Sequence, residues 1–200
     1  MGKIYYVMGK SASGKDTIYK RLVKELPEFG TVRMYTTRPI RDGETNGVEY
    51  IFTDEKQLQT MKDAGKVIEC RTYDTIYGPW SYFTADDGQI DLGSGSYLMM
   101  GTLESYEKLC SYYGAEVMVP LYIHVEDRIR LQRALDRENT QKNPKYAEMC
   151  RRFLADEKDF AKERLDQCGI RKQYENTGLE PCIEEIIKLS LIHISEPTRL

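Results

Sequence analysis

The stretch GKSASGKDT, Gly9 to Thr17, comes close to the pattern G-x-x-x-x-G-K-[ST]. In that pattern the backbone N–H groups of a glycine-rich loop surround the phosphates of a nucleotide, and a lysine reaches the outer phosphates. Gly9, Gly14 and Lys15 occupy the defining positions. Asp16 stands where a hydroxyl that binds Mg²⁺ is usual, so a loop suited to an anion carries a carboxylate beside it.

The segments on either side of this loop have the patterns of a strand and a helix. KIYYVMG, residues 3–9, is a continuous apolar run, which is typical of a strand buried on both faces. KDTIYKRLVKELP, residues 15–27, places Ile18, Leu22 and Leu26 four residues apart and ends at a proline, which predicts a helix. Strand, loop and helix in this order are the context that the phosphate-binding pattern needs.

Strand and helix patterns continue to alternate along the chain. We expect strands over 96–101, 117–125 and 170–176, and helices over 102–114, 125–138, 147–165 and from about residue 179. This alternation predicts an α/β fold, a mainly parallel P-loop sheet with helices on both faces. Residues 139–145 are polar and rich in helix breakers, which predicts a loop. Residues 34–83 hold short polar and aromatic segments, which we interpret as an insertion over the sheet rather than a separate domain.

Composition narrows the class of protein. The formal net charge of −3 makes no case for attraction to nucleic acid or to a membrane, and no apolar run approaches the length of a membrane span. The five cysteines include no C-x-x-C pair, and their odd number fits free thiols in a reducing compartment. We therefore expect a cytoplasmic protein.

The last twelve residues, LSLIHISEPTRL (189–200), differ in kind from the rest. Eleven of them in a row, 189–199, match one reading frame of a common transposon sequencing adapter. We interpret them as an artefact without function, in preference to a natural helix that frays at its end. His124 is then the one histidine available for chemistry.

A second dense patch, YTTRPIRDGETNGVEYIF, covers residues 35–52. Arg38 and Arg41 lie three residues apart in it, and the planar guanidinium group suits phosphate oxygens. A solvated charged loop is the ordinary interpretation of such a cluster. Because this patch follows a phosphate-binding loop, a second phosphate site is favoured.

In this patch the sequence resembles the guanylate kinases, whose loop has the form T-T-R-x-P-R-x-G-E-x-x-G-x-D-Y-x-F. The matching residues are Thr36, Thr37, Arg38, Arg41, Gly43, Glu44, Gly47, Tyr50 and Phe52, with Glu49 in place of the Asp and Pro39 one position early. Downstream, Glu69 in GKVIE and the pair Tyr77-Gly78 match the family's G-x-x-x-E and Tyr-Gly. The resemblance covers residues 1–188 and implies a nucleoside-monophosphate kinase fold, with a nucleotide-binding insertion at 34–83 and a short lid at 133–148.

The resemblance implies that an acceptor phosphate is held by Arg38, Arg41, Tyr50 and Tyr77. Glu69 would read guanine, because a carboxylate accepts from the ring N–H and the amino group, whereas adenine presents an acceptor nitrogen at that ring position. The base side departs from the family elsewhere. Its two base-reading serines fall at Met34 and Pro79, with Ser81 as a slipped substitute for the second, and its D-x-D strand end is MMG, 99–101.

On the donor side, the resemblance implies that ATP is bound by Gly9, Ser11, Ala12, Ser13, Gly14, Lys15, Asp16 and Thr17, with Asn176 on the adenine side. Lys15 would also be catalytic, together with arginines from the lid. Arg130, Arg133 and Arg137 lie near one helical face, and the lid arginines map best to Arg133 and Arg137. A third maps to Arg152, with Arg151 as the alternative. Asp16 either caps the helix or binds Mg²⁺, a cation that prefers oxygen ligands.

The expected activity is transfer of a phosphoryl group from ATP to GMP with Mg²⁺, giving GDP and ADP in purine nucleotide metabolism. A phosphate acceptor is already anionic, so no general base is needed. One alternative is a kinase of the same fold with another nucleoside monophosphate as acceptor. A second is a non-catalytic guanylate-kinase-like module that binds a phosphopeptide, which would have no use for the triphosphate loop. The sequence does not distinguish a monomer from a homodimer.

Overall fold

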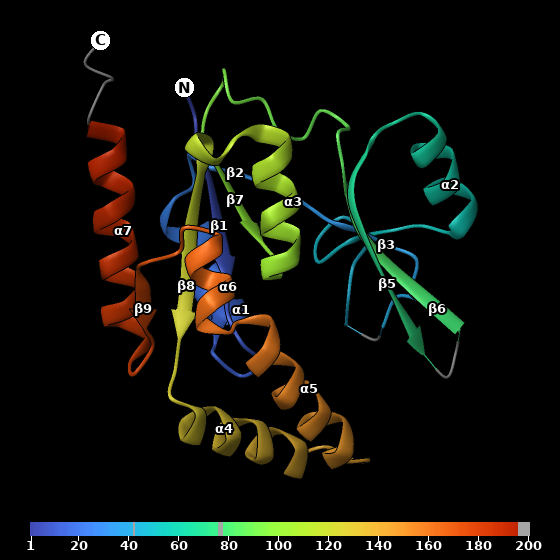
Figure 1. The fold of residues 1–200 in the computed structure, drawn as a ribbon, viewed down its shortest axis with the longest axis vertical. Helices are drawn as coiled ribbons and strands as arrows, with labels where there is room; N and C mark the ends of the chain where they lie inside the picture. The colour runs from blue at the N-terminus through green and yellow to red at the C-terminus, as the bar shows by residue number, and fades with distance from the viewer. Residues whose placement is uncertain (42, 76–77, 196–200) are drawn as a thin grey trace. The chain divides into compact units, whose positions relative to one another are not determined.

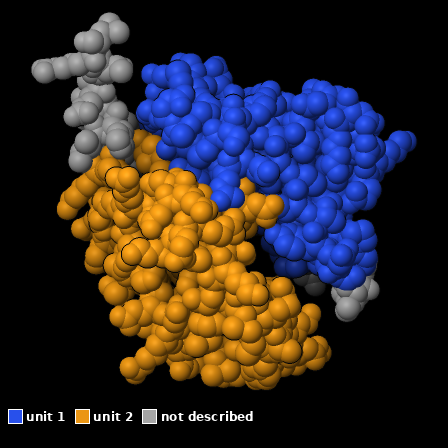
Figure 2. Space-filling view, in the orientation of Figure 1, with its two compact units in different colours: residues 1–4, 28–99, 105–118 blue, residues 5–27, 100–104, 119–200 orange. Residues whose placement is uncertain are grey.

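The computed structural model of the protein describes residues 1–41, 43–75 and 78–195, with side chains up to residue 189. The chain forms two compact units. Unit 1 comprises residues 1–4, 28–99 and 105–118, and unit 2 comprises residues 5–27, 100–104 and 119–200 (Figure 2). Each unit is described by itself below.

A five-stranded sheet confirms the predicted fold class. Its strand order is β2 (Gly30–Thr31), β7 (Tyr97–Met100), β1 (Ile4–Met8), β8 (Met118–His124) and β9 (Gln173–Glu175). The pairs β2–β7 and β8–β9 are parallel. Every residue of β1 is buried, as its continuous apolar run predicts. The result is a mixed α/β fold with a parallel central sheet flanked by helices (Figure 1).

The helices that the sequence predicts are all present, with one difference. They are α1 (Lys15–Glu25), α3 (Leu103–Tyr113), α4 (Asp127–Asn139), α5 (Tyr146–Asp159), α6 (Lys162–Gln167) and α7 (Leu179–Ser195), with a short 3₁₀ helix at Ala115–Val117. The single stretch predicted over 147–165 is broken between α5 and α6. Phe160 lies at the break, is buried, and stacks on Tyr122 with ring centroids 5.5 Å apart. Burial of this ring accounts for the turn.

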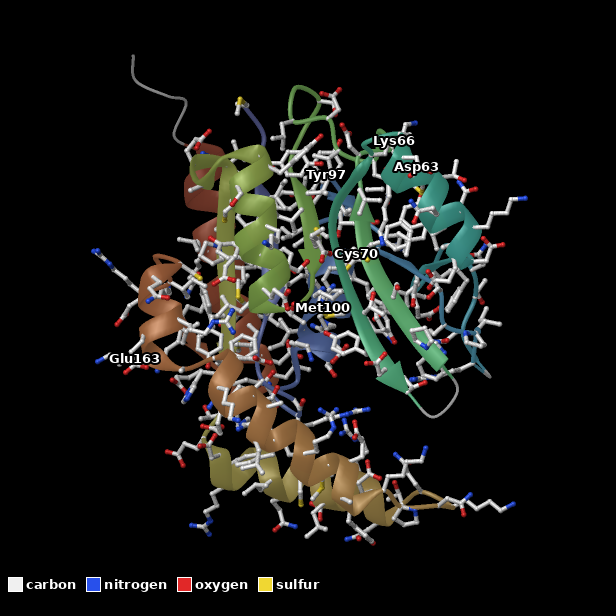
Figure 3. All side chains as sticks on the ribbon, turned by 45° about the vertical axis from the view of Figure 1, so that its right-hand side comes forward. Asp63, Lys66, Cys70, Tyr97, Met100 and Glu163 are labelled. Carbon is white, nitrogen blue, oxygen red and sulfur yellow. The ribbon has the colours of Figure 1, made fainter. Side chains whose placement is uncertain are left out.

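Unit 1 contains a second sheet that the sequence did not predict. It has the order β4 (Ile51–Phe52), β3 (Tyr35–Thr36), β6 (Gly78–Ala85) and β5 (Val67–Thr75), and helix α2 (Glu55–Asp63) belongs to the same unit. Leu58 and Met61 of α2 form a buried cluster with Phe83 and Ala85 of β6. Cys70, labelled on β5 in Figure 3, packs against this cluster.

The face of this sheet opposite α2 carries the residues of interest. Directly opposed residues of an antiparallel pair share a face, and successive residues alternate between faces. Cys70 opposes Phe83 on the α2 side, so the neighbouring pairs Glu69–Thr84 and Arg71–Tyr82 lie on the other side. We call this side, defined by Glu69, Arg71, Tyr82 and Thr84, the Glu69 face.

Helix α7 continues beyond the end of the region that resembles guanylate kinases, to Ser195. The interpretation of 189–200 as an artefact stays a prediction. Within the described part of the chain, no helix combines the length and the apolar character needed to cross a membrane.

Candidate nucleotide-binding sites

The phosphate-binding loop of unit 2 joins β1 to α1, and its glycines are required by geometry. Gly14 is the N-cap of α1 and has φ 84°, a left-handed conformation that glycine adopts without strain. A Cβ at Gly14 would lie 2.5 Å from Asn176 Nδ2, and one at Gly9 would lie 2.6 Å from the Ile123 carbonyl oxygen. Ala12 also has a positive φ, 61°, and such strained positions cluster at binding sites.

Asn176 holds the loop from the end of β9. Its Nδ2 donates to the Ser13 carbonyl oxygen over 2.8 Å, and the residue is 5% exposed. Arg133 Nη2 donates to the Asn176 carbonyl oxygen over 3.3 Å. The structure therefore brings together the predicted residues Ser13, Gly14, Asn176 and Arg133. It shows Asn176 supporting the loop, a role that differs from the expected contact with adenine.

Arg130 is a site residue to which the sequence assigned no role. It is 1% exposed, and its Nη1 donates to the Ser11 carbonyl oxygen over 3.1 Å. Its guanidinium also pairs with three carboxylates, those of Asp127 at 2.8 Å, Glu157 at 2.8 Å and Asp156 at 3.5 Å. In the sequence, Arg130 could be noticed only because it lies on the same helical face as Arg133 and Arg137. Its burial, which the structure shows, distinguishes Arg130 from these two arginines.

One backbone N–H of the loop is occupied by a carboxylate. Ser11 N–H donates to Asp156 Oδ2 over 2.7 Å, in the same cluster as Arg130. The adjacent Lys10 pairs with Glu157 at 2.7 Å. We expected the N–H groups from Ser11 to Thr17 to face phosphate oxygens. For Ser11 this requires Asp156 to move or to be replaced by the phosphate.

Lys15 and Asp16 lie side by side in the first turn of α1. Lys15 Nζ is 3.5 Å from Asp16 Oδ2, and the Asp16 side chain is 68% exposed. The N-cap of α1 is Gly14, so Asp16 does not cap the helix, contrary to one of the two interpretations of the sequence. The described residues contain no group of three or more His, Cys, Asp or Glu side chains suited to hold a metal ion. Asp16 supplies an exposed carboxylate beside Lys15, and carboxylate oxygens are a ligand type that Mg²⁺ accepts.

The other arginines that the resemblance assigned to a lid lie on α4 and α5. Arg137 and Arg152 line a cavity of about 10 Å³ that Ser11 of the loop also lines. Arg152 Nε donates to Glu148 Oε1 over 2.9 Å, and Arg151 also pairs with Glu148. Hydrogen bonds from Arg151, and then from Arg152, lower the pKa of Glu148 to about 2. The structure thus brings Arg137 and Arg152 near the loop and holds Arg152 on its own helix.

The end of β7 explains why no acidic pair stands there. Met99 is fully buried, and a Cβ at Gly101 would overlap the Tyr6 hydroxyl. That hydroxyl donates to the Thr102 carbonyl oxygen over 3.2 Å. An aspartate at position 101 would therefore displace Tyr6, so the glycine is required by close packing.

In unit 1, Arg38 and Glu44 form a buried ion pair in the predicted acceptor loop. Arg38 is 3% exposed, and its Nη1 and Nη2 donate to the two Glu44 carboxylate oxygens over 2.7 and 2.5 Å. The Arg41 backbone N–H donates to Glu44 Oε2 over 2.9 Å. Hydrogen bonding to Arg38, aided by the Arg41 backbone, lowers the pKa of Glu44 to about 2. A carboxylate thus occupies the donors that we assigned to an acceptor phosphate.

Aromatic rings surround the Arg38 guanidinium. Its Cζ lies 5.2 Å from the ring centroids of both Tyr50 and Phe52. Tyr82 packs edge-on against Tyr50 at 5.6 Å, and hydrogen bonding to Glu44 and to Tyr82 raises the pKa of Arg38. The sequence did not identify Tyr82. The alternation in GPWSYFTA, 78–85, was the available signal.

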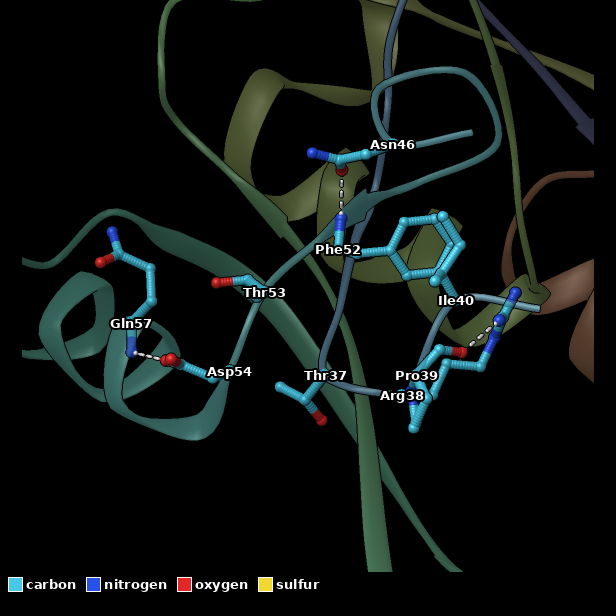
Figure 4. A pocket seen from close by; sticks show the side chains of 9 residues that line it. All are labelled: Thr37, Arg38, Pro39, Ile40, Asn46, Phe52, Thr53, Asp54 and Gln57. Atoms are coloured by element: carbon cyan, nitrogen blue, oxygen red, sulfur yellow. Dashed lines mark hydrogen bonds between the residues drawn. The ribbon is translucent and has the colours of Figure 1, made fainter. Parts of the chain in front are cut away.

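An open pocket of about 620 Å³ lies beside Arg38 (Figure 4). It is lined by Thr37, Arg38, Pro39, Ile40, Asn46, Phe52, Thr53, Asp54 and Gln57. The structure therefore brings Arg38 and Tyr50 together beside a space that a ligand can enter. The Arg41 side chain is exposed, and Tyr77 lies outside the described residues.

Glu69 is a buried residue rather than the surface acid that an ordinary strand end would carry. Its side chain is 1% exposed, and Arg71 Nε donates to its Oε2 over 3.0 Å. Arg71 Nη2 and Thr84 Oγ1 both approach its Oε1, at 3.4 and 2.9 Å. Glu69 is thus paired with a cation in the structure, and a base that binds it must share it with Arg71.

Ser81 is not a substitute for the missing base-reading serine. It is 2% exposed, and its Oγ is 2.9 Å from Thr72 Oγ1. Its backbone N–H donates to Thr37 Oγ1 over 2.9 Å. Ser81 opposes Thr72 in the hairpin, on the α2 side of the sheet, so its hydroxyl faces away from the Glu69 face.

Comparison with known proteins agrees with the resemblance. Residues 1–81 match the family model described as guanylate kinase. The match covers these residues and not the rest of the chain, so it shows similarity to guanylate kinases over 1–81. Guanylate kinases of Legionella pneumophila (strain Lens) and Coxiella burnetii (strain RSA 493 / Nine Mile phase I) are each 37% identical to the chain, over 78 and 76 residues. Each alignment covers 38% of this chain and 37% of the relative, so the chain matches less than two fifths of their length.

The fold of the whole chain resembles that of a solved guanylate kinase. The crystal structure of guanylate kinase from Anaplasma phagocytophilum matches with a TM-score of 0.64 and 15% sequence identity. The match covers 98% of this chain and 87% of that one. Similarity of sequence to guanylate kinases thus covers the phosphate loop, residues 35–52, Glu69 and Arg71, while similarity of fold extends to helices α4 and α5.

Proposed function

We propose that the protein transfers the γ-phosphoryl group of ATP to GMP, giving GDP and ADP. The phosphate loop carries this proposal. It places a left-handed Gly14 at the N-terminus of α1 with Lys15 next to it, within residues that match the guanylate kinase family model. Helix N-termini and successive N–H groups bind phosphates, and the lysine adds a charge suited to the β- and γ-phosphates.

The acceptor phosphate binds at Arg38, Arg41 and Tyr50, and the resemblance adds Tyr77. The Glu44 carboxylate bound to Arg38 supports this assignment, because two oxygens of a phosphate fit the same two donors. The phosphate of GMP would displace the Glu44 carboxylate from Arg38, or both anions would bind Arg38 together. The insertion at 34–83 supplies this site, and the lid at 133–148 belongs to the donor side.

The reaction depends on alignment and charge, since the acceptor phosphate is already an oxyanion and needs no base. Lys15 neutralises the donor phosphates, and Arg133, Arg137 and Arg152 bind the transferring group as the lid closes. Mg²⁺, when bound, neutralises charge on the same phosphates. The exposed carboxylate of Asp16, beside Lys15, is the protein group that would hold it. We also propose a cytoplasmic location and a role in purine nucleotide metabolism.

A kinase of the same fold with another acceptor is the second candidate. Met34 and Pro79 favour it, because neither side chain supplies the hydroxyl that the family uses to read the base. A coupled assay of ADP release with GMP, dGMP, AMP, CMP and UMP separates the two. We expect turnover to be highest with GMP. If kcat/KM is higher with another monophosphate, that nucleotide is the acceptor instead of GMP.

Variants of Lys15 test the catalytic claim itself. Lys15→Met should abolish ADP release, whereas Lys20→Met, which removes an exposed lysine from the same helix, should leave it unchanged. If the wild-type protein releases no ADP with any of the five acceptors but binds a phosphopeptide, the non-catalytic module is the correct function.

A further inference from the structure

Arg71 lies at the centre of the Glu69 face and has no part in the roles assigned so far. Its side chain is 7% exposed, and its Nε and Nη2 both point at the Glu69 carboxylate. Nη2 also lies 3.6 Å from Met34 Sδ. A thioether sulfur is a weak acceptor, so this contact uses a charged donor poorly. An oxygen acceptor at the same place would bind Arg71 more strongly.

The position of Met34 relates this contact to recognition of the acceptor base. By the resemblance, residue 34 is where a serine hydroxyl helps to read the acceptor base, and Pro79 stands at the second such position. Methionine has no hydrogen-bond donor, and proline lacks even a backbone N–H. The donor that these positions fail to supply is present nearby, on the Arg71 guanidinium that approaches Met34.

The Glu69 face also connects Arg71 to the phosphate site. Tyr82 opposes Arg71 across the β5–β6 hairpin, and a hydrogen bond that Arg38 donates to Tyr82 contributes to the raised pKa of Arg38. Arg38, Tyr82, Arg71 and Glu69 therefore follow one another within unit 1. A nucleotide whose phosphate binds at Arg38 would extend its base toward the Arg71–Glu69 pair.

We propose that Arg71 determines base specificity by donating to the carbonyl oxygen of a 6-oxopurine, in place of the family's serines. This inference rests on the proposed function and deepens it. Glu69 accepts from the ring N–H and the amino group of guanine, while Arg71 donates to the neighbouring oxygen. Adenine presents an amino group where Arg71 needs an acceptor, so the same pair rejects it.

Two guanine analogues separate the two halves of this pair. In 6-thio-GMP a sulfur replaces the 6-oxygen, while the ring N–H and amino group that Glu69 binds are kept. IMP keeps the oxygen and the ring N–H but lacks the amino group. In the wild type, kcat/KM should fall about tenfold to a hundredfold from GMP to 6-thio-GMP, the range for loss of a charge-assisted hydrogen bond.

Variants assign this loss to Arg71. In Arg71→Met the ratio of kcat/KM for GMP to that for 6-thio-GMP should fall to about one, while the GMP to IMP ratio is kept. Arg71→Lys keeps a charge beside Glu69 but not the planar pair of donors, so its ratio should be intermediate. Adding Met34→Ser to Arg71→Lys should restore part of the ratio, since serine supplies a donor. Arg171→Lys, the same change at an exposed arginine, serves as the matched control.

Melting temperatures show which variants fold. If Arg71→Met leaves Glu69 unpaired and unfolds, Arg71→Lys and the Met34→Ser combination still decide the matter. A GMP to 6-thio-GMP ratio that Arg71→Lys does not change, in a protein that still phosphorylates GMP, overturns the role of Arg71 and leaves the proposed function standing. Absence of phosphoryl transfer to every monophosphate overturns both.

Discussion

Replacing Glu44 with glutamine removes the charge that faces the buried Arg38. The pKa of Glu44 is lowered from 4.5 to about 2, first by its hydrogen bond to Arg38. At 1.36 kcal/mol for each pH unit, this difference stabilises the folded state of unit 1 by about 3 kcal/mol at pH 7. Because the folded-state pKa lies below the ordinary value, the stabilisation is complete well above pH 4.5 and is lost as the pH falls toward 2.

This stabilisation can be measured because it depends on pH. At pH 3 only about 1 kcal/mol of the stabilisation should remain, so the difference in unfolding free energy between wild type and Glu44→Gln should decrease by about 2 kcal/mol between pH 7 and pH 3. Urea unfolding at the two pH values measures this gap, and all groups that titrate alike in the two proteins cancel.

The Arg38→Met background provides the control for this experiment. Without the guanidinium, the effect of Glu44→Gln should change much less between pH 7 and pH 3, as in a double-mutant cycle, because only the smaller influence of Arg41 remains. A wild-type gap that stays constant between the two pH values would refute the reasoning, since the carboxylate would then gain nothing from being ionised beside Arg38.

Four further predictions concern the two sites and the chain end. Arg41→Ala should raise the KM for GMP about tenfold to a hundredfold and leave ATP affinity unchanged. If the binding of ATP weakens as much as the binding of GMP, Arg41 has a structural role. Asp156→Asn should strengthen metal-free ATP binding in a fluorescence titration, because a carboxylate no longer competes for Ser11 N–H; weaker binding would contradict this. Asp16→Asn should raise the Mg²⁺ concentration for half-maximal turnover. If the Mg²⁺ titration is unchanged, the ligands of the cation are phosphates and water, and Asp16 does not bind it. Deleting 189–200 should change neither Tm nor turnover, and loss of either defeats the adapter interpretation.

The strand, loop and helix around Lys15 could be predicted because each depends on a local pattern. A continuous apolar run, glycines at fixed spacing and a four-residue apolar repeat need no knowledge of distant residues. The break between α5 and α6 could not be predicted in this way. It depends on the stacking of Phe160 on Tyr122, a contact between residues far apart in the sequence.

The hairpin of β5 and β6 was missed because charged residues hide its pattern. Glu69 and Arg71 look like exposed positions in the sequence, yet each permits the burial of the other. The same mutual pairing hides Arg130 among the lid arginines and Glu44 among the polar residues of its loop. Such pairs become visible only when both members are placed in space.

The hydrogen bond from Asn176 to the Ser13 carbonyl oxygen has a consequence for synthesis on the ribosome. The two residues are 163 positions apart, so the ribosome makes the loop well before it makes the residue that supports it. At about 5–20 residues per second, roughly 8–33 s separate the two. Throughout that interval the nascent chain carries Gly14 and Lys15 without the side chain that fixes their backbone. Nucleotide binding should therefore begin only after β9 has emerged, and ATP would stabilise the finished protein without assisting the early steps of its folding.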